Sequence, residues 1–163
     1  MSAIQAPPAA TNRPALLAAA LAFASTAVTL YWLAGGTWLL DTVGGEIEAL
    51  ARERSAGTFA LGGGAALLKA AAGLLALALV HPFPTPLSPR LLARLALTAG
   101  VVLTLYGGVL VIAGALVLSG VIDPSGPVDE HALRWHVFFW DAWFVVWGAT
   151  LTVAARRARH PIR

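Results

Sequence analysis

Two charged residues, Lys69 and Asp141, stand deep inside long apolar stretches of the sequence. An unpaired charge near the centre of a bilayer costs at least about 2.5–3.5 kcal/mol, and an ionisable residue at such depth is by default a hypothesis for a functional site. At 1.5 Å of rise per residue, Lys69 lies about 15 Å from its predicted helix end and Asp141 about 12 Å from its own. Opposite charges at matching depth relieve this cost by pairing, so we predict a contact between Lys69 and Asp141. Such a pair either fixes the register of two helices or belongs to a functional site.

A buried acid beside aromatic rings suits acid–base chemistry. A carboxyl group in an apolar pocket could protonate an alkene or an epoxide, and tryptophan faces could stabilise the resulting cation by about 2 kcal/mol or more each. The corresponding hypothesis is an isomerase or cyclase with Asp141 as the acid, Lys69 as the group that tunes it, and Tyr31 at similar depth. A tight ion pair with Lys69 would oppose this chemistry by keeping Asp141 ionised.

Aromatic residues gather in the same half of the predicted helices. We expect the residues that bind a ligand to be Trp32, Trp38, Tyr106, Arg134, His136, Trp140 and Trp143. Arg134 is also a second, shallower candidate partner for Asp141. The alternatives are an interfacial aromatic belt, which fits Trp38 better than the deeper tryptophans, and a His136 that only makes an interfacial hydrogen bond.

The composition excludes several classes of function. The chain is 58% hydrophobic and 12% charged, about half the charge of a soluble domain, so it belongs to the membrane class. It has no cysteine, which excludes disulfides and thiolate metal sites. No metalloprotease, EF-hand or phosphate-loop motif occurs, so we expect no metal and no cofactor. The net charge of +3 is small, and the basic residues gather near the termini, so no nucleic-acid partner is expected.

Four apolar runs must position these residues. They cover about 14–40, 59–80, 91–121 and 133–155, and each reaches the roughly 20 residues that cross a bilayer. The fold class is therefore all-α, a bundle of four transmembrane helices. A secretory signal peptide is the alternative for the first run, but that run is longer than a signal core of about 7–15 residues. We expect a disordered tail over 1–13 and a basic tail over 156–163.

Turn and capping residues agree with this division. Prolines between positions 82 and 89 close the second helix, because proline cannot continue a helix. Ser88 is a predicted N-cap, with Pro89 at the first position of the third helix, and Asp129 is a predicted cap of the fourth. The loop 41–57 contains a short amphipathic stretch, a predicted surface helix with Ile47 and Leu50 dipping into the membrane.

The distribution of arginine predicts the orientation. One set of helix ends carries Arg13, Arg90, Arg94, Arg156, Arg157, Arg159 and Arg163, whereas the other carries only three arginines beside acidic residues. By the positive-inside rule, both termini are expected in the cytoplasm. The expected location is the bacterial cytoplasmic (inner) membrane, as a multi-pass protein.

Two motifs carry a family resemblance. They are the YWxxGG motif beginning at Tyr31 and the WHxFxWDxWF motif beginning at Trp135. Together they resemble a family of small bacterial four-helix membrane proteins known only as a domain of unknown function. The resemblance implies the four-helix fold and supplies no activity.

Three hypotheses for function follow. The first is an intramembrane site for an apolar small molecule or lipid, with or without the acid–base chemistry. The second is a small transporter, which requires a homo-oligomer because one short chain encloses little pathway. The third is a non-catalytic accessory subunit of a membrane complex, with the ion pair as a register lock. The lipid bilayer is the partner common to all three.

Overall fold

The computed structural model describes residues 9–81 and 87–159 of the chain. Within these ranges the chain is helical, without strands, and comprises α1 (Ala9–Leu33), α2 (Gly45–Glu53), α3 (Ala56–Ala78), α4 (Pro89–Leu118), α5 (Glu130–Trp135), a π-helical turn η1 (His136–Trp140) and α6 (Asp141–Arg159). The last three run on without a break over Glu130–Arg159. The prediction of an all-α fold is confirmed.

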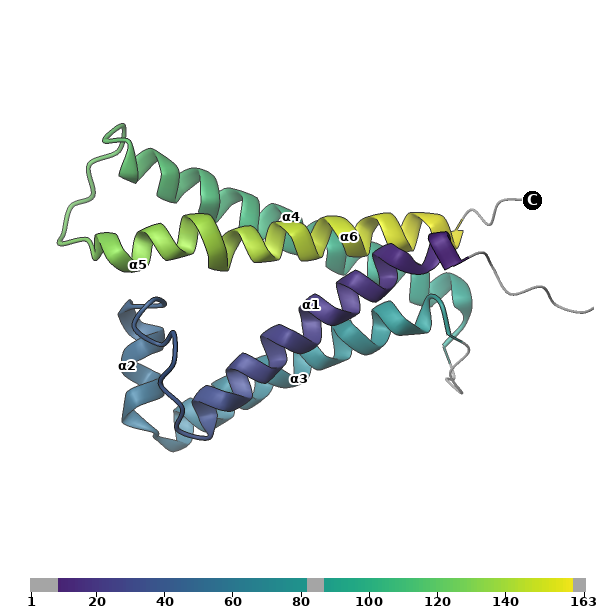
Figure 1. Cartoon of the computed structure of the whole chain (residues 1–163), viewed down its shortest axis with the longest axis horizontal. Helices are drawn as coiled ribbons and strands as arrows, with labels where there is room; N and C mark the ends of the chain where they lie inside the picture. The colour runs from purple at the N-terminus through teal and green to yellow at the C-terminus, as the bar shows by residue number, and fades with distance from the viewer. Residues whose placement is uncertain (1–8, 82–86, 160–163) are drawn as a thin grey trace, which may run out of the picture.

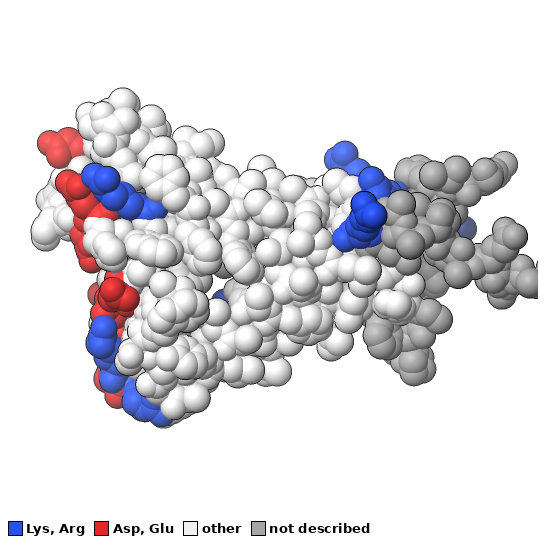
Figure 2. All heavy atoms as spheres, viewed as in Figure 1, with Lys and Arg blue, Asp and Glu red and all other residues white. Residues whose placement is uncertain are grey.

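Four of these helical segments are long and apolar enough to cross a membrane. They are Arg13–Leu33, Ala56–Ala78, Pro89–Leu118 and Glu130–Arg159. Figure 2 shows Lys and Arg side chains at both ends of the molecule, acidic side chains at one end only, and an almost uncharged band between them. This is the surface of a multi-pass membrane protein, because the hydrocarbon core of a bilayer excludes exposed charge.

The ends of the helices differ in places from the expected ranges. α1 already begins at Ala9, within the range expected for a disordered tail, and ends at Leu33 instead of position 40. Its early end is explained by the left-handed backbone at Gly35 and Leu39, with φ of 100° and 59°, which no α-helix accommodates. α6 continues to Arg159, so half of the expected basic tail, residues 156–159, is helical. Residues 1–8, 82–86 and 160–163 lie outside the described residues.

Two predicted caps are present. The Ser88 hydroxyl accepts the Leu91 amide at 3.3 Å, with Pro89 at the start of α4. The Asp129 carboxylate accepts the Ala132 amide at 3.1 Å and begins the α5–α6 segment. Ser55 caps α3 in the same way, through the Thr58 amide at 3.3 Å, and was not predicted.

The helices associate as two pairs, α1 with α3 and α4 with α6 (Figure 1). Glycines permit close approach within each pair. A side chain at Gly73 would meet Phe23 at 2.9 Å, and one at Gly148 would meet the Gly100 carbonyl oxygen at 2.6 Å. Small residues drive helix association in lipid because they let the backbones approach closely.

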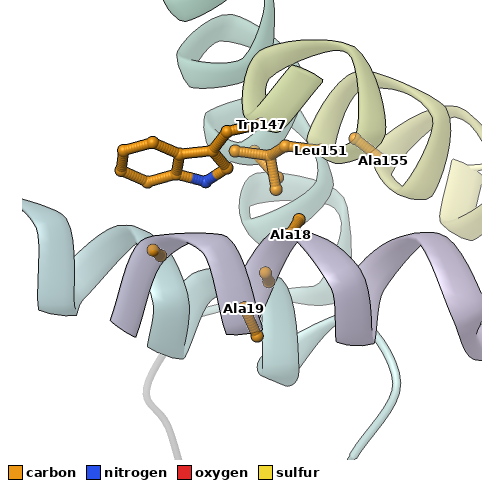
Figure 3. Packing of buried hydrophobic residues seen from close by; sticks show 8 residues of the cluster. Ala18, Ala19, Trp147, Leu151 and Ala155 are labelled. Carbon is orange, nitrogen blue, oxygen red and sulfur yellow. The ribbon is translucent and has the colours of Figure 1, made fainter. Parts of the chain in front are cut away.

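The two pairs meet at one end and diverge toward the other (Figure 1). The terminal end, where α1 begins and α6 ends, holds the buried core: Ala18, Ala19 and Ala22 of α1 with Ala76, Ala96, Trp147, Leu151 and Ala155. Figure 3 shows the α6 side chains of Trp147 and Leu151 facing alanines of α1. Near the chain termini, alanines let α1 and α6 pack closely. In the other half of the bundle α1 still contacts the last span, through the rings of Trp32 and Trp140, whose centroids lie 5.5 Å apart.

The opposite end, called the open end below, carries α2 and the segment that joins it to α1. The predicted short helix is present as α2, with Ile47 and Leu50 on one side. Both side chains line the space between the two helix pairs. The fold thus holds a space between two diverging arms, with α2 across the wider end.

Substitution of Gly148 tests the close contact between α4 and α6. We expect Gly148→Ala to lower the free energy of unfolding by about 1–3 kcal/mol, because the new methyl group would collide with the α4 backbone. The matched control is Gly108→Ala, since a side chain at Gly108 meets nothing within 4 Å. Thermal unfolding in detergent measures both. Equal melting temperatures for the two variants would contradict the close contact.

Candidate functional site

A cavity of about 540 Å³ lies between the two helix pairs. Most of its lining is aliphatic or aromatic and comes from α1, α2, α3, η1 and α6, with Tyr106 from α4. Ligand sites in proteins are clefts of roughly 300–1,000 Å³ with apolar walls and a few convergent polar groups. The cavity fits that description, and its polar groups stand on two facing walls.

Lys69 is the polar group of the α3 wall. Its ammonium donates a hydrogen bond to the Thr29 hydroxyl at 2.8 Å. That hydroxyl in turn donates to the Ser25 carbonyl at 3.0 Å, and Thr29 is buried. Within the described residues, none of the ion pairs shorter than 4.0 Å includes Lys69. The predicted contact between Lys69 and Asp141 is therefore wrong, although both side chains line the same cavity.

Asp141 is the polar group of the facing wall and is only 5% exposed. Its carboxylate lies 3.3 Å from Nδ1 of His136. The other ring nitrogen, Nε2, lies 2.9 Å from the Val43 carbonyl oxygen. His136 therefore joins α6 to the segment that follows α1.

The π turn explains why His136 and Asp141 meet. In an α-helix, residues five apart point about 140° away from each other. Here the Asp141 amide donates to the His136 carbonyl, five residues back, which closes the wider π turn. This turn brings the two side chains onto one face. Such π turns often occur at functional sites.

The hydrogen-bond partners assign the protons of this pair. A carbonyl oxygen only accepts, so Nε2 of His136 must carry a proton toward Val43. The contact between Nδ1 and the carboxylate then needs one further proton, held by either group. The pair is either an imidazolium with a carboxylate or a neutral imidazole with a carboxylic acid. Both forms have zero net charge, and they differ only by a proton transfer.

The segment between α1 and α2 covers the cavity at the open end of the molecule. Trp140 donates from Nε1 to the Thr42 hydroxyl at 3.0 Å, beside the bond from His136 to Val43. The Trp32 ring packs edge-on against Trp140, with centroids 5.5 Å apart, and its Nε1 donates to the Trp38 carbonyl at 2.9 Å. These contacts link the two arms where their helices have diverged.

Eight of the ten residues predicted for the site line the cavity: Asp141, Lys69, Trp32, Trp38, Tyr106, His136, Trp140 and Trp143. Tyr31 does not, because its ring lies over Gly36 and its hydroxyl accepts the Trp38 amide at 3.4 Å. Arg134 does not either, since its side chain is 65% exposed and pairs with Glu130 at 3.3 Å. Its predicted role as a partner of Asp141 is wrong.

Comparison with known proteins identifies the family to which the chain belongs. Residues 20–151 match the model of the family described as "Protein of unknown function (DUF3995)". The chain belongs to this family. No curated protein and no solved structure matches the chain. The matched residues include every residue of the cavity wall, so the site lies wholly within the part shared with DUF3995.

Two hydrogen-bond partners in this DUF3995 site could not be predicted from the sequence: Thr29 for Lys69 and His136 for Asp141. Thr29 is an ordinary residue of an apolar helix, and its only signal was a hydroxyl at the depth of Lys69. His136 was a predicted ligand contact, but not the partner of Asp141. Helical spacing made Arg134 a candidate partner of Asp141, because a regular α-helix was assumed between them.

Replacement of His136 tests its two hydrogen bonds. We expect His136→Phe to lower the free energy of unfolding by about 2–4 kcal/mol, because the Asp141 carboxyl group and the Val43 carbonyl both lose their hydrogen-bond partner. The matched control is His131→Phe, since His131 is exposed and makes one long contact with Asp41 at 3.9 Å. Thermal melting in detergent compares them. A His136→Phe variant as stable as the control would contradict the assignment.

Asp141→Asn should change stability little, within about 1 kcal/mol. An asparagine amide can donate to Nδ1 of a neutral imidazole, which keeps the contact without an ionised group. The same melting experiment measures it. A loss of several kcal/mol would mean that the pair exists only as imidazolium and carboxylate.

Proposed function

We propose that this protein binds one apolar or amphipathic small molecule, of the size of a single lipid chain, in the cavity between its helix pairs. The observation that carries the proposal is a roughly 540 Å³ cavity with apolar walls at membrane depth. Close packing is the rule inside proteins, so a space of this size argues for an occupant.

The length of the cavity supports a chain-like occupant. Along α3 the lining residues run from Thr58 to Lys69, about 17 Å at 1.5 Å per residue. This is roughly half of the 30 Å hydrocarbon core of a bilayer, which is the reach of one acyl chain. Tryptophan faces from Trp32, Trp140 and Trp143 offer contacts to such a chain or to an unsaturated one.

Acid–base chemistry on the occupant is a second candidate, favoured by the proton held between His136 and Asp141. When Asp141 holds the shared proton, the pair presents a carboxylic acid at the cavity wall. The imidazole of His136 can then receive a proton as well as supply one. An isomerase or cyclase needs both steps. The predicted ion pair with Lys69, which would oppose this chemistry, is absent among the described residues. The chemistry therefore requires the form of the His136–Asp141 pair in which Asp141 holds the proton.

The other two hypotheses have less support. The accessory-subunit hypothesis rested on a Lys69–Asp141 pair as a register lock, and each of these residues has another partner. The transporter hypothesis requires a homo-oligomer and stays a prediction.

Filling the cavity tests the binding proposal. The probe is the methyl ester of dibromostearic acid, whose bromines quench nearby tryptophans, added to the purified protein in detergent. We expect Ala65→Phe to weaken binding about tenfold or more, because Ala65 lines the cavity and the larger ring takes the place of the ligand.

The matched control is Ala71→Phe, which adds the same ring to an exposed position of α3 outside the cavity. This variant should bind as the wild type does. Equal quenching of wild type, Ala65→Phe and Ala71→Phe would mean that the probe reaches tryptophans from the detergent and not from the cavity, and the proposal would then fail.

A further inference from the structure

The charge balance of the cavity is not zero. The His136–Asp141 pair is neutral whichever group holds the shared proton. Among the described residues that line the cavity, Asp141 is the only acidic one. Lys69 therefore contributes a positive charge that no group of the described wall neutralises.

Lys69 also retains hydrogen-bonding capacity. An ammonium has three N–H donors, and in the described part of the chain Thr29 accepts one of them. Thr29 cannot act as a counterion, because its hydroxyl is uncharged. At least two donors are left to point toward the cavity or its edge.

A second cation stands at the other end of the same cavity. Arg54 closes α2 with a left-handed backbone, φ 55°, and its guanidinium lies 5.6 Å from the centre of the Phe59 ring. Among the described residues it forms no ion pair either. In contrast, Arg52 of the same helix is paired with Glu48 at 2.6 Å and does not line the cavity. Both cations that line the cavity, Lys69 and Arg54, are thus without a carboxylate partner among the described residues.

We infer that the occupant is a single-chain amphiphile with an anionic headgroup, a carboxylate or a phosphate, and that Lys69, positioned by its hydrogen bond to Thr29, holds the headgroup. This inference rests on the proposed binding function and names the class of its ligand. Lys69 is the lining residue of α3 farthest from α2. The headgroup therefore lies at the narrow end of the cavity, and the chain runs along the apolar walls toward the open end. Arg54, at that open end, attracts the anion as it enters.

The experiment compares two probes of equal chain length that differ in charge. They are dibromostearic acid, in mildly alkaline buffer where its carboxyl group is ionised, and its methyl ester. We expect the wild type to bind the acid about tenfold to a hundredfold more tightly than the ester, as a charge-assisted hydrogen bond requires. The corresponding dibromoalkyl phosphate, used as a third probe, distinguishes a phosphate headgroup from a carboxylate by its tighter binding.

Lys69→Met should abolish the preference for the acid and leave binding of the ester within about twofold. Methionine has a similar length and no charge. An uncharged side chain is tolerated in a membrane helix, so the variant is expected to fold. Lys69→Arg should keep the preference. Arg52→Gln removes a positive charge of the same helix end without touching the cavity, and it should keep the preference as well.

The outcomes separate this inference from the function on which it rests. If the wild type binds acid and ester equally while Ala65→Phe weakens both, the cavity binds an apolar ligand and the anionic headgroup is wrong. If Ala65→Phe weakens neither, the binding function itself fails. A preference for the acid that survives Lys69→Met would also overturn the role of Lys69.

Discussion

The contact between the alanine face of α1 and the Trp147 side of α6 is the interaction on which the rest of the structure depends. Helices in lipid gain little from the hydrophobic effect, so they associate where small residues let them approach. On α1 those residues are Ala18, Ala19 and Ala22, all near the chain termini. Farther along, threonines and Trp32 replace the alanines, and the two helix pairs must separate. The cavity is the direct result of this gradient in side-chain size.

The π turn has an equally local cause and an equally large effect. One wider turn in an otherwise regular helix aligns His136 with Asp141. Without it, the carboxylate would have no partner on its wall. The turn also directs Trp140 toward Thr42, which attaches the segment after α1 to the other arm. A single irregular turn thereby joins the acid–base pair to the cover of the cavity.

Much of this fold could be predicted from the sequence, and the failures have physical reasons. The lengths of the apolar runs predict four spans, and Ser88 and Asp129 predict two caps. The positions of Lys69 and Asp141 in their apolar runs predict that both lie deep within their spans. The pairing of these charges could not be predicted, because matching depth does not determine the lateral separation of two diverging helices. Nor could the π turn, since its residues are compatible with a regular α-helix. Tyr31 was misplaced because α1 ends sooner than its hydropathy suggests, and its ring serves the turn that follows.

For the ligand proposed above, the bond from His136 to Val43 would link the residence time to the state of the acid–base pair. A molecule leaving through the open end would have to displace the segment that contains Thr42 and Val43. Nε2 of His136 donates to Val43 in both states of the pair, but an imidazolium donates more strongly than a neutral ring. Transfer of the shared proton from Asp141 to His136 would therefore strengthen this contact and slow the release of the ligand, and return of the proton would weaken it.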